Sequence, residues 1–306
     1  MKEDIAGLHI GGGYITVAQV KASRNSLSIR RVGWVPYDNN DEDAKLCARL
    51  RQAMSNAGAV TCSLAGAVRS SRCLVKPFSY PYMRRDEIAA ALQLDAEESL
   101  MLPPSEICLD WHTNSSERPS EGEAGGGHVE GVLAATPRQD IESELAVLRQ
   151  ARLYPVRLDA EVIALANFFA CVAAEDLRTP GTCLLYLAND RVHVCVFYGE
   201  SSVYPRTVQV HAKDRHRKAA EVVEDVQEDL RYLMHKLHKP KIEQFALIDG
   251  VDGLNELGAQ LEEAFAVPVK PWEPLADIDM SKNLRDKIAA GPGTRILPAL
   301  GLAING

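Results

Sequence analysis

Three consecutive glycines near the start of the chain are the residues whose types and spacing are most typical of a ligand-binding turn. Gly11, Gly12 and Gly13 follow a short apolar segment, and from Tyr14 onward the sequence returns to a strand pattern. Because glycine adopts positive φ freely, the chain can reverse tightly at this point. Backbone N–H groups at such a turn can hold a phosphate, but the glycines could equally serve the turn alone.

Several titratable side chains are spaced so that they could act together, and each has a simpler structural explanation. His235 and His238 could share a metal ion, but no nearby cysteine or carboxylate completes a ligand set. Asp249 and Asp252 could be paired carboxylates for acid–base catalysis, yet turns are commonly rich in Asp and Gly. His9 could be a catalytic base, and a partly buried structural histidine is the simpler interpretation. We therefore predict no catalytic residue and no metal site.

Composition and charge narrow the classes of protein further. The 306 residues are 46% hydrophobic and carry a formal net charge of -8, whereas nucleic-acid binding needs clustered Lys and Arg. No apolar run reaches the ~20 residues of a membrane-spanning helix, and we expect no signal peptide at the N-terminus. The seven cysteines contain no Cys-x-x-Cys pair, as expected for reduced thiols in the cytoplasm. The sequence also lacks the P-loop pattern Gly-x-x-x-x-Gly-Lys-Ser/Thr, which argues against a Walker-type ATPase.

The apolar pattern predicts mixed α/β structure in the first half of the chain. A hairpin over 7–20 opens it, and helical spacing over 84–100 predicts a helix. Two prolines within 76–82 should end strand character at about Val75, and the Ser-, Glu- and Gly-rich stretch 113–128 is typical of a flexible loop. The remaining predicted elements of this half are the strands 27–35, 59–68, 107–112, 129–135 and 156–158 and the helices 44–54, 140–150 and 161–173.

The second half repeats the strand–turn–strand opening of the first. Thr179-Pro180-Gly181 is the predicted boundary between two domains, 1–178 and 179–306. A long helix over 219–239 carries its apolar residues on one stripe, and a closing helix over 296–304 has Pro298 in its first turn. The other predicted elements are the strands 183–187, 191–198, 202–210, 245–248 and 267–270 and the helix 254–265.

Two halves that each open with a β-hairpin resemble the duplicated architecture of actin-like proteins, and the order of motifs is similar to that of the PilM and FtsA family. The family's first motif, Gly-(Ile/Val)-Asp-(Ile/Val)-Gly, corresponds to Gly7-Leu8-His9-Ile10-Gly11. An inserted helix with a Leu-Pro-Pro segment corresponds to 84–104, and an Ala-Ala-Pro-Arg step corresponds to 134–138. The closing Gly-Leu-Ala corresponds to 301–303. The resemblance therefore covers nearly the whole chain.

The resemblance implies an actin-like (ribonuclease H-like) α/β fold with an inserted 1C subdomain at about 76–136. Domain I, 1–178, would hold subdomain 1A and this insertion. Domain II, 179–306, would hold subdomain 2A and an abbreviated 2B at about 211–239. A nucleotide site, vestigial if present, would involve Gly11, Gly12, Gly13, Tyr14, Asp249 and Gly250.

Departures from the family's motifs argue against ATP hydrolysis. His9 stands where the family has the aspartate that organises Mg²⁺, and a neutral imidazole is a poor ligand for this cation. Tyr186-Leu187-Ala188 replaces the second motif, Asp-(Ile/Leu)-Gly, and Asp249-Gly250 replaces a Gly-Gly turn. Because phosphoryl transfer depends on a metal ion and positioned donors, we expect a pseudo-ATPase that needs no cofactor, with ATP and Mg²⁺ disfavoured. The alternative is an active actin-like ATPase or a sugar-kinase relative.

In this family, a short N-terminal tail of the membrane protein PilN binds between the first subdomain and the insertion. The resemblance therefore implies a cytoplasmic scaffold, peripheral to the inner membrane through a PilN-like partner, in a pilus, secretion or DNA-uptake machine. Self-association is a further option. Aromatic and methionine side chains are enriched at binding surfaces, although here they could equally pack the insertion onto the first subdomain. The residues predicted to contact the tail are Phe78, Tyr80, Tyr82, Met83 and Leu92.

Overall fold

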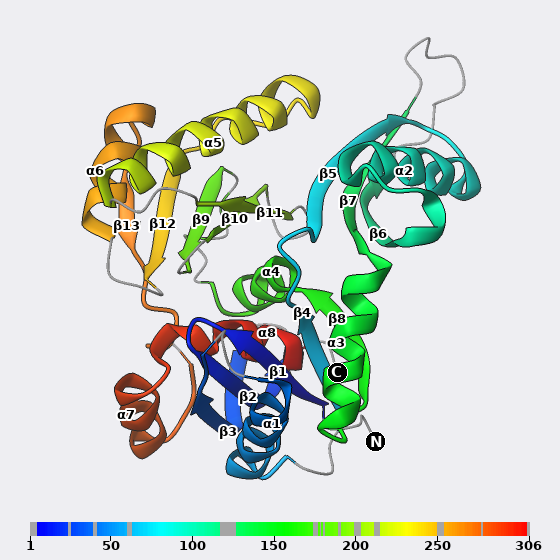
Figure 1. The fold of residues 1–306 in the computed structure, drawn as a ribbon. Helices are drawn as coiled ribbons and strands as arrows, with labels where there is room; N and C mark the ends of the chain where they lie inside the picture. Colours follow the sequence, from blue (N-terminus) through cyan, green and yellow to red (C-terminus); the bar gives the residue numbers. More distant parts are fainter. Residues whose placement is uncertain are drawn as a thin grey trace.

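The structure of the chain is a computed structural model. It describes residues 5–23, 26–38, 42–59, 63–116, 127–173, 177, 179, 181–188, 191–198, 203–210, 215–249, 254–276 and 278–304. Two five-stranded sheets and a smaller three-stranded sheet are arranged around central helices (Figure 1). Among the described residues, no helix combines the length and apolar character needed to cross a bilayer.

The first sheet has the strand order β3-β2-β1-β4-β8. Its first three strands form an antiparallel meander, and β1, β4 and β8 then run parallel. Helices α1 (Asp43–Ala57) and α3 (Arg138–Gln150) supply apolar residues to the core on one face, and α4 (Glu161–Val172) lies on the other. The strands are β1 (Ile5–Gly11), β2 (Tyr14–Ser23), β3 (Ser26–Pro36), β4 (Ser63–Val68) and β8 (Pro155–Ala160).

The second sheet repeats this topology, with the order β11-β10-β9-β12-β13. Three antiparallel strands are again followed by two parallel pairings, so the predicted internal duplication is confirmed. Helices α5 (Arg215–Lys236) and α6 (Leu254–Phe265) cover one face through an apolar cluster. The strands are β9 (Thr182–Leu187), β10 (Arg191–Phe197), β11 (Val203–Gln209), β12 (Gln244–Asp249) and β13 (Val269–Pro271).

An inserted unit leaves the first half after β4 and returns at α3. It consists of a sheet of order β5-β7-β6 and the helix α2 (Arg85–Leu100). The strands are β5 (Leu74–Pro81), β6 (Ile107–Ser116) and β7 (His128–Pro137), and a short 3-10 turn, η1 (Pro104–Glu106), precedes β6. The prediction that strand character ends near Val75 is wrong, because β5 continues to Pro81. It can do so as an edge strand, where proline is tolerated.

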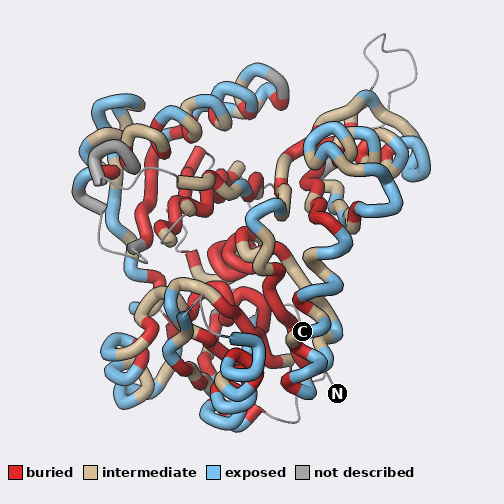
Figure 2. The backbone as a smooth tube through the Cα atoms, viewed as in Figure 1, coloured by how far each residue is buried: buried red, intermediate tan, exposed pale blue. Residues whose placement is uncertain are grey.

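The end of the chain returns to the first half. After α7 (Lys282–Ala290), which the sequence did not predict, and the turn η3 (Gly293–Ile296), helix α8 (Leu297–Ile304) packs between α4 and β1. Figure 2 shows this central region as buried. The predicted range 179–306 for a separate second domain is therefore wrong for its last part. A buried apolar helix is stabilised wherever a matching face exists, and the sequence does not specify which sheet supplies that face.

Candidate functional site

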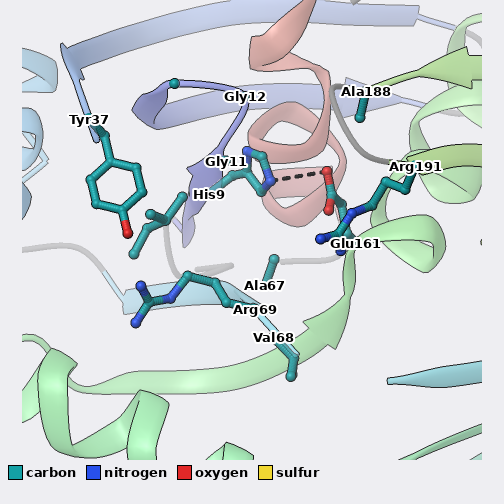
Figure 3. Close-up of a pocket in the computed structure, with 12 residues that line it drawn as sticks. His9, Gly11, Gly12, Tyr37, Ala67, Val68, Arg69, Glu161, Ala188 and Arg191 are labelled. Atoms are coloured by element: carbon teal, nitrogen blue, oxygen red, sulfur yellow. Dashed lines mark ion pairs between the residues drawn. The ribbon is translucent and has the colours of Figure 1, made fainter. Parts of the chain in front are cut away.

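A cavity of about 420 Å³ lies between the two halves, where several strand ends meet. The β1–β2 turn, the end of β4, the first residue of α4 and the facing ends of β9 and β10 surround it (Figure 3). Its lining residues are His9, Ile10, Gly11, Gly12, Gly13, Tyr37, Ala67, Val68, Arg69, Glu161, Ala188 and Arg191.

The predicted glycine turn forms one wall of this cavity. Gly12 and Gly13 have φ of 59° and 81°, a left-handed conformation that side chains with a Cβ rarely adopt. A Cβ on Gly11 would lie 2.6 Å from Cε1 of His9, so this glycine gives the imidazole its space. Tyr14 is not among the lining residues, and its ring packs against the guanidinium of Arg295 at 5.7 Å.

At the base of the cavity, one carboxylate lies between two histidines that come from different halves. Oε1 of Glu161, at the start of α4, lies 3.1 Å from Nε2 of His9 on β1 and 3.4 Å from Nε2 of His193 on β10. Figure 3 shows His9 and Glu161 facing each other. Burial of Glu161 would raise its pKa, but attraction to His193 and His9 outweighs burial and holds this pKa well below its usual range.

Other contacts of the two histidines fix their positions. Both imidazoles are buried. Nδ1 of His193 lies 3.0 Å from the hydroxyl oxygen of Thr207, and the ring stacks on Tyr186. Among the described residues, Nδ1 of His9 and Nε2 of His193 have no hydrogen-bond partner, so the contact of His193 with Glu161 is an electrostatic contact at 3.4 Å. Tyr186, which stands where the family's second motif has a carboxylate, is therefore a buried packing residue.

Arginines contribute the positive charge around the cavity. Arg191 extends from the start of β10 and Arg69 follows β4 (Figure 3). Nε of Arg69 donates to Oε2 of Glu144 at 2.6 Å. Burial raises the pKa of Glu144 even though the neighbouring Arg69 opposes this shift. The cavity thus combines exposed backbone of the glycine turn with two guanidinium groups.

The donor set does not fit Mg²⁺, which demands an octahedral shell of oxygen atoms. Within the described ranges, no group of three or more His, Cys, Asp or Glu residues could hold a metal ion. Among the described lining residues, Glu161 is the one carboxylate, and its Oε1 is already close to both imidazoles. His235 lies on α5, whereas His238 follows the helix with φ of 50°, so the two do not form a helical metal pair.

The remaining predicted nucleotide residues are only partly described. Asp249 ends β12 beside Leu187 of β9, but its side chain and Gly250 lie outside the described residues. Sequence analysis did not identify Glu161, His193, Arg69, Arg191 or Tyr37 as site residues. A signal existed for His193 alone, since it is an ionisable residue flanked by valines within a largely apolar strand.

The residues predicted to bind a partner tail are divided between the core and the surface of the insertion. Phe78 and Leu92 are buried in the apolar cluster of the insertion. Both side chains therefore pack the core of the insertion. The hydroxyl of Tyr80 donates to Oδ2 of Asp95 at 2.6 Å. Tyr82 and Met83 are partly exposed in the short segment that follows β5 and precedes α2.

Comparison with solved structures defines the class of fold. The chain is similar to a Bacteroides thetaiotaomicron protein with an actin-like ATPase fold and unknown function. The TM-score is 0.51 and the identity 9%, and the match covers 89% of this chain and 92% of that one. It is also similar to a chain of the PilM–PilN type IV pilus biogenesis complex, with a TM-score of 0.72 and 20% identity. This match covers 100% of this chain and 99% of that one. The predicted actin-like fold and the resemblance to PilM at the level of fold are confirmed. No protein-family model and no curated protein sequence matches the chain.

Proposed function

We propose that the chain is a scaffold of an inner-membrane pilus, secretion or DNA-uptake assembly, and that it binds the cytoplasmic tail of a PilN-like membrane protein. The observation that carries this proposal is similarity over the whole length, insertion included, to a chain of the PilM–PilN complex. Under this proposal, the chain lies in the cytoplasm and reaches the inner membrane through its partner.

We further propose that this scaffold does not hydrolyse ATP. The support is chemical: the described residues offer no oxygen-rich metal site, and the carboxylate in the cavity is engaged with two imidazoles. Phosphoryl transfer needs a metal ion and donors aimed at the developing charge. We therefore assign the cavity no catalytic step and the chain no required cofactor.

We place the proposed tail-binding surface on the short segment between β5 and α2. Tyr82 and Met83 combine partial exposure with apolar contact to the core of the insertion. The backbone N–H of Tyr82 donates to the carbonyl of Gly127 at 2.6 Å, which holds this segment in place. Anchored aromatic and methionine side chains of this kind suit an extended peptide.

The test is calorimetric titration of the protein with a synthetic peptide of a PilN-like cytoplasmic tail. We expect the double variant Tyr82→Ala, Met83→Ala to bind about tenfold or more weakly, because truncating an anchoring contact typically costs about 2 kcal/mol. Tyr154→Ala is the matched control, since Tyr154 is 70% exposed and lies in the first half. Absence of binding by the unaltered protein would reject the function, and equal losses in both variants would reject this surface.

The alternative function, an active actin-like ATPase or kinase, is favoured by one feature. The cavity of about 420 Å³ joins a glycine turn to two arginines, and such groups can receive phosphate. The two proposals differ in whether Mg·ATP stabilises the folded chain.

A further inference from the structure

We propose that two carboxylates brace the second half of the molecule, so that the orientation of the halves is fixed by the protein's own side chains without a bridging ligand. The braces are Glu161 at the cavity and Glu130 on the insertion. This inference does not depend on the identity of any partner.

The cavity brace joins the two large sheets. Glu161 begins α4, and its Oε1 approaches His9 of the first sheet and His193 of the second at 3.1 and 3.4 Å. Neither imidazole is in the same element as the carboxylate, and the two strands belong to different sheets. Separation of the halves must therefore remove at least one imidazole from the carboxylate.

The insertion brace joins β7 to the second half. Glu130 is 3% exposed. Its Oε2 accepts a hydrogen bond from the hydroxyl of Tyr204 on β11 at 2.9 Å and lies 2.6 Å from Nζ of Lys239. The ammonium of Lys239 also lies 5.5 Å from the centre of the Tyr204 ring. The Glu130 carboxylate therefore contacts both the Tyr204 hydroxyl and the Lys239 ammonium of the second half.

Additional contacts beside Glu130 make this junction continuous. Strands β5 and β11 lie side by side, and the amide of Asn114 on β6 donates to the carbonyl of Val203 at 3.5 Å. His128 contributes a further positive group when protonated, since its Nε2 lies 3.5 Å from Oε1 of Glu130. The insertion, although it leaves from the first half, is therefore attached to the second.

Burial explains why these contacts should resist separation. A carboxylate that loses its partners while still shielded from water is strongly disfavoured. Glu130, which is 3% exposed, meets this condition. The side chain of Glu161 is 17% exposed at the cavity, so its brace resists separation through the attraction between the carboxylate and the two imidazoles. At this cavity, the contacts between the halves are thus made by the chain's own side chains.

Single-molecule fluorescence energy transfer on the full chain tests this proposal. Dyes are attached through genetically encoded reactive amino acids that replace Arg51 on α1 and Glu263 on α6, both of which are exposed. The energy transfer between them reports the separation of the two halves. We expect one narrow distance population in the unaltered protein. The double variant Glu130→Gln, Glu161→Gln should increase the population of other separations about tenfold or more, which corresponds to ~1.4 kcal/mol.

Two controls distinguish release of the braces from general loosening. A dye pair at Arg51 and Lys287, both in parts that pack with the first sheet, should be unaffected. Asp86→Asn, which removes an exposed ion pair with Arg84, should leave every distance unchanged. An unchanged distribution in the double variant overturns the proposal, and so does equal broadening of both dye pairs.

A gentler pair of substitutions applies if the double variant does not fold. His193→Gln and Tyr204→Phe together remove one contact from each brace and leave both carboxylates in place. We expect a smaller broadening of the same Arg51–Glu263 distance. No change in that distance would again overturn the proposal.

Discussion

Glu161 brings two distant histidines into one cluster at the base of the cavity. His9 and His193 lie on strands of different sheets, and both approach the same carboxylate oxygen. Sequence analysis identified His9 because it departs from a motif. It did not find Glu161, because contacts between residues so far apart in the chain leave no local pattern.

The ionised form of Glu161 should stabilise the native state. Because its folded-state pKa is held below the usual 4.5, this contribution is present above pH 4.5 and is lost as the pH falls through the folded-state value. We expect Glu161→Gln to lower the free energy of unfolding at pH 7 by about 1–3 kcal/mol. In urea titrations, the difference from the unaltered protein should shrink below pH 4.5. A difference that stays constant into acid would contradict this assignment.

At the scale of elements, glycines allow α8 to approach its neighbours closely. A Cβ on Gly301 would lie 1.9 Å from the carbonyl oxygen of Ala164 on α4, and one on Gly7 would lie 2.0 Å from that of Ala299. The closing helix itself was predicted from its apolar residues and from Pro298. The position of this helix was not predicted, because a glycine in the local sequence does not indicate which distant segment packs against it.

Gly301→Ala should therefore destabilise the chain by about 3 kcal/mol, since the added methyl group overpacks a helix–helix contact formed by backbone. The measurement is the denaturant midpoint. Gly258→Ala on α6 is the matched control, because the nearest atoms to its added Cβ are side-chain carbons at 3.6 and 3.7 Å. There we expect a gain of up to about 1 kcal/mol from helix propensity. Equal effects of the two substitutions would contradict the close packing of α8.

Other elements show why local patterns succeed or fail. The β1–β2 hairpin and α2 were predicted because alternation, glycine turns and helical spacing act within a few residues. Strand β5 was truncated in the prediction because prolines exclude a central strand, whereas pairing with β7 alone makes β5 an edge. Whether a strand lies at an edge depends on the whole sheet.

At the scale of the whole molecule, the repeated order of elements predicted the duplicated actin-like fold, and the structure has two sheets of the same topology. The return of the chain to the first half could not be read from that order. Neither could the attachment of the insertion to the second half through Glu130, since its partners Tyr204 and Lys239 belong to another unit.

We propose that protein side chains hold the cavity between the halves, and that its described residues do not provide the ligands for a magnesium–nucleotide complex. Thermal unfolding with and without Mg·ATP tests it most directly. We expect the same unfolding midpoint at millimolar nucleotide as in its absence. Ligand at 100 times its dissociation constant would stabilise the fold by about 2.7 kcal/mol, so a clear rise in the midpoint that depends on both Mg²⁺ and ATP would contradict the account.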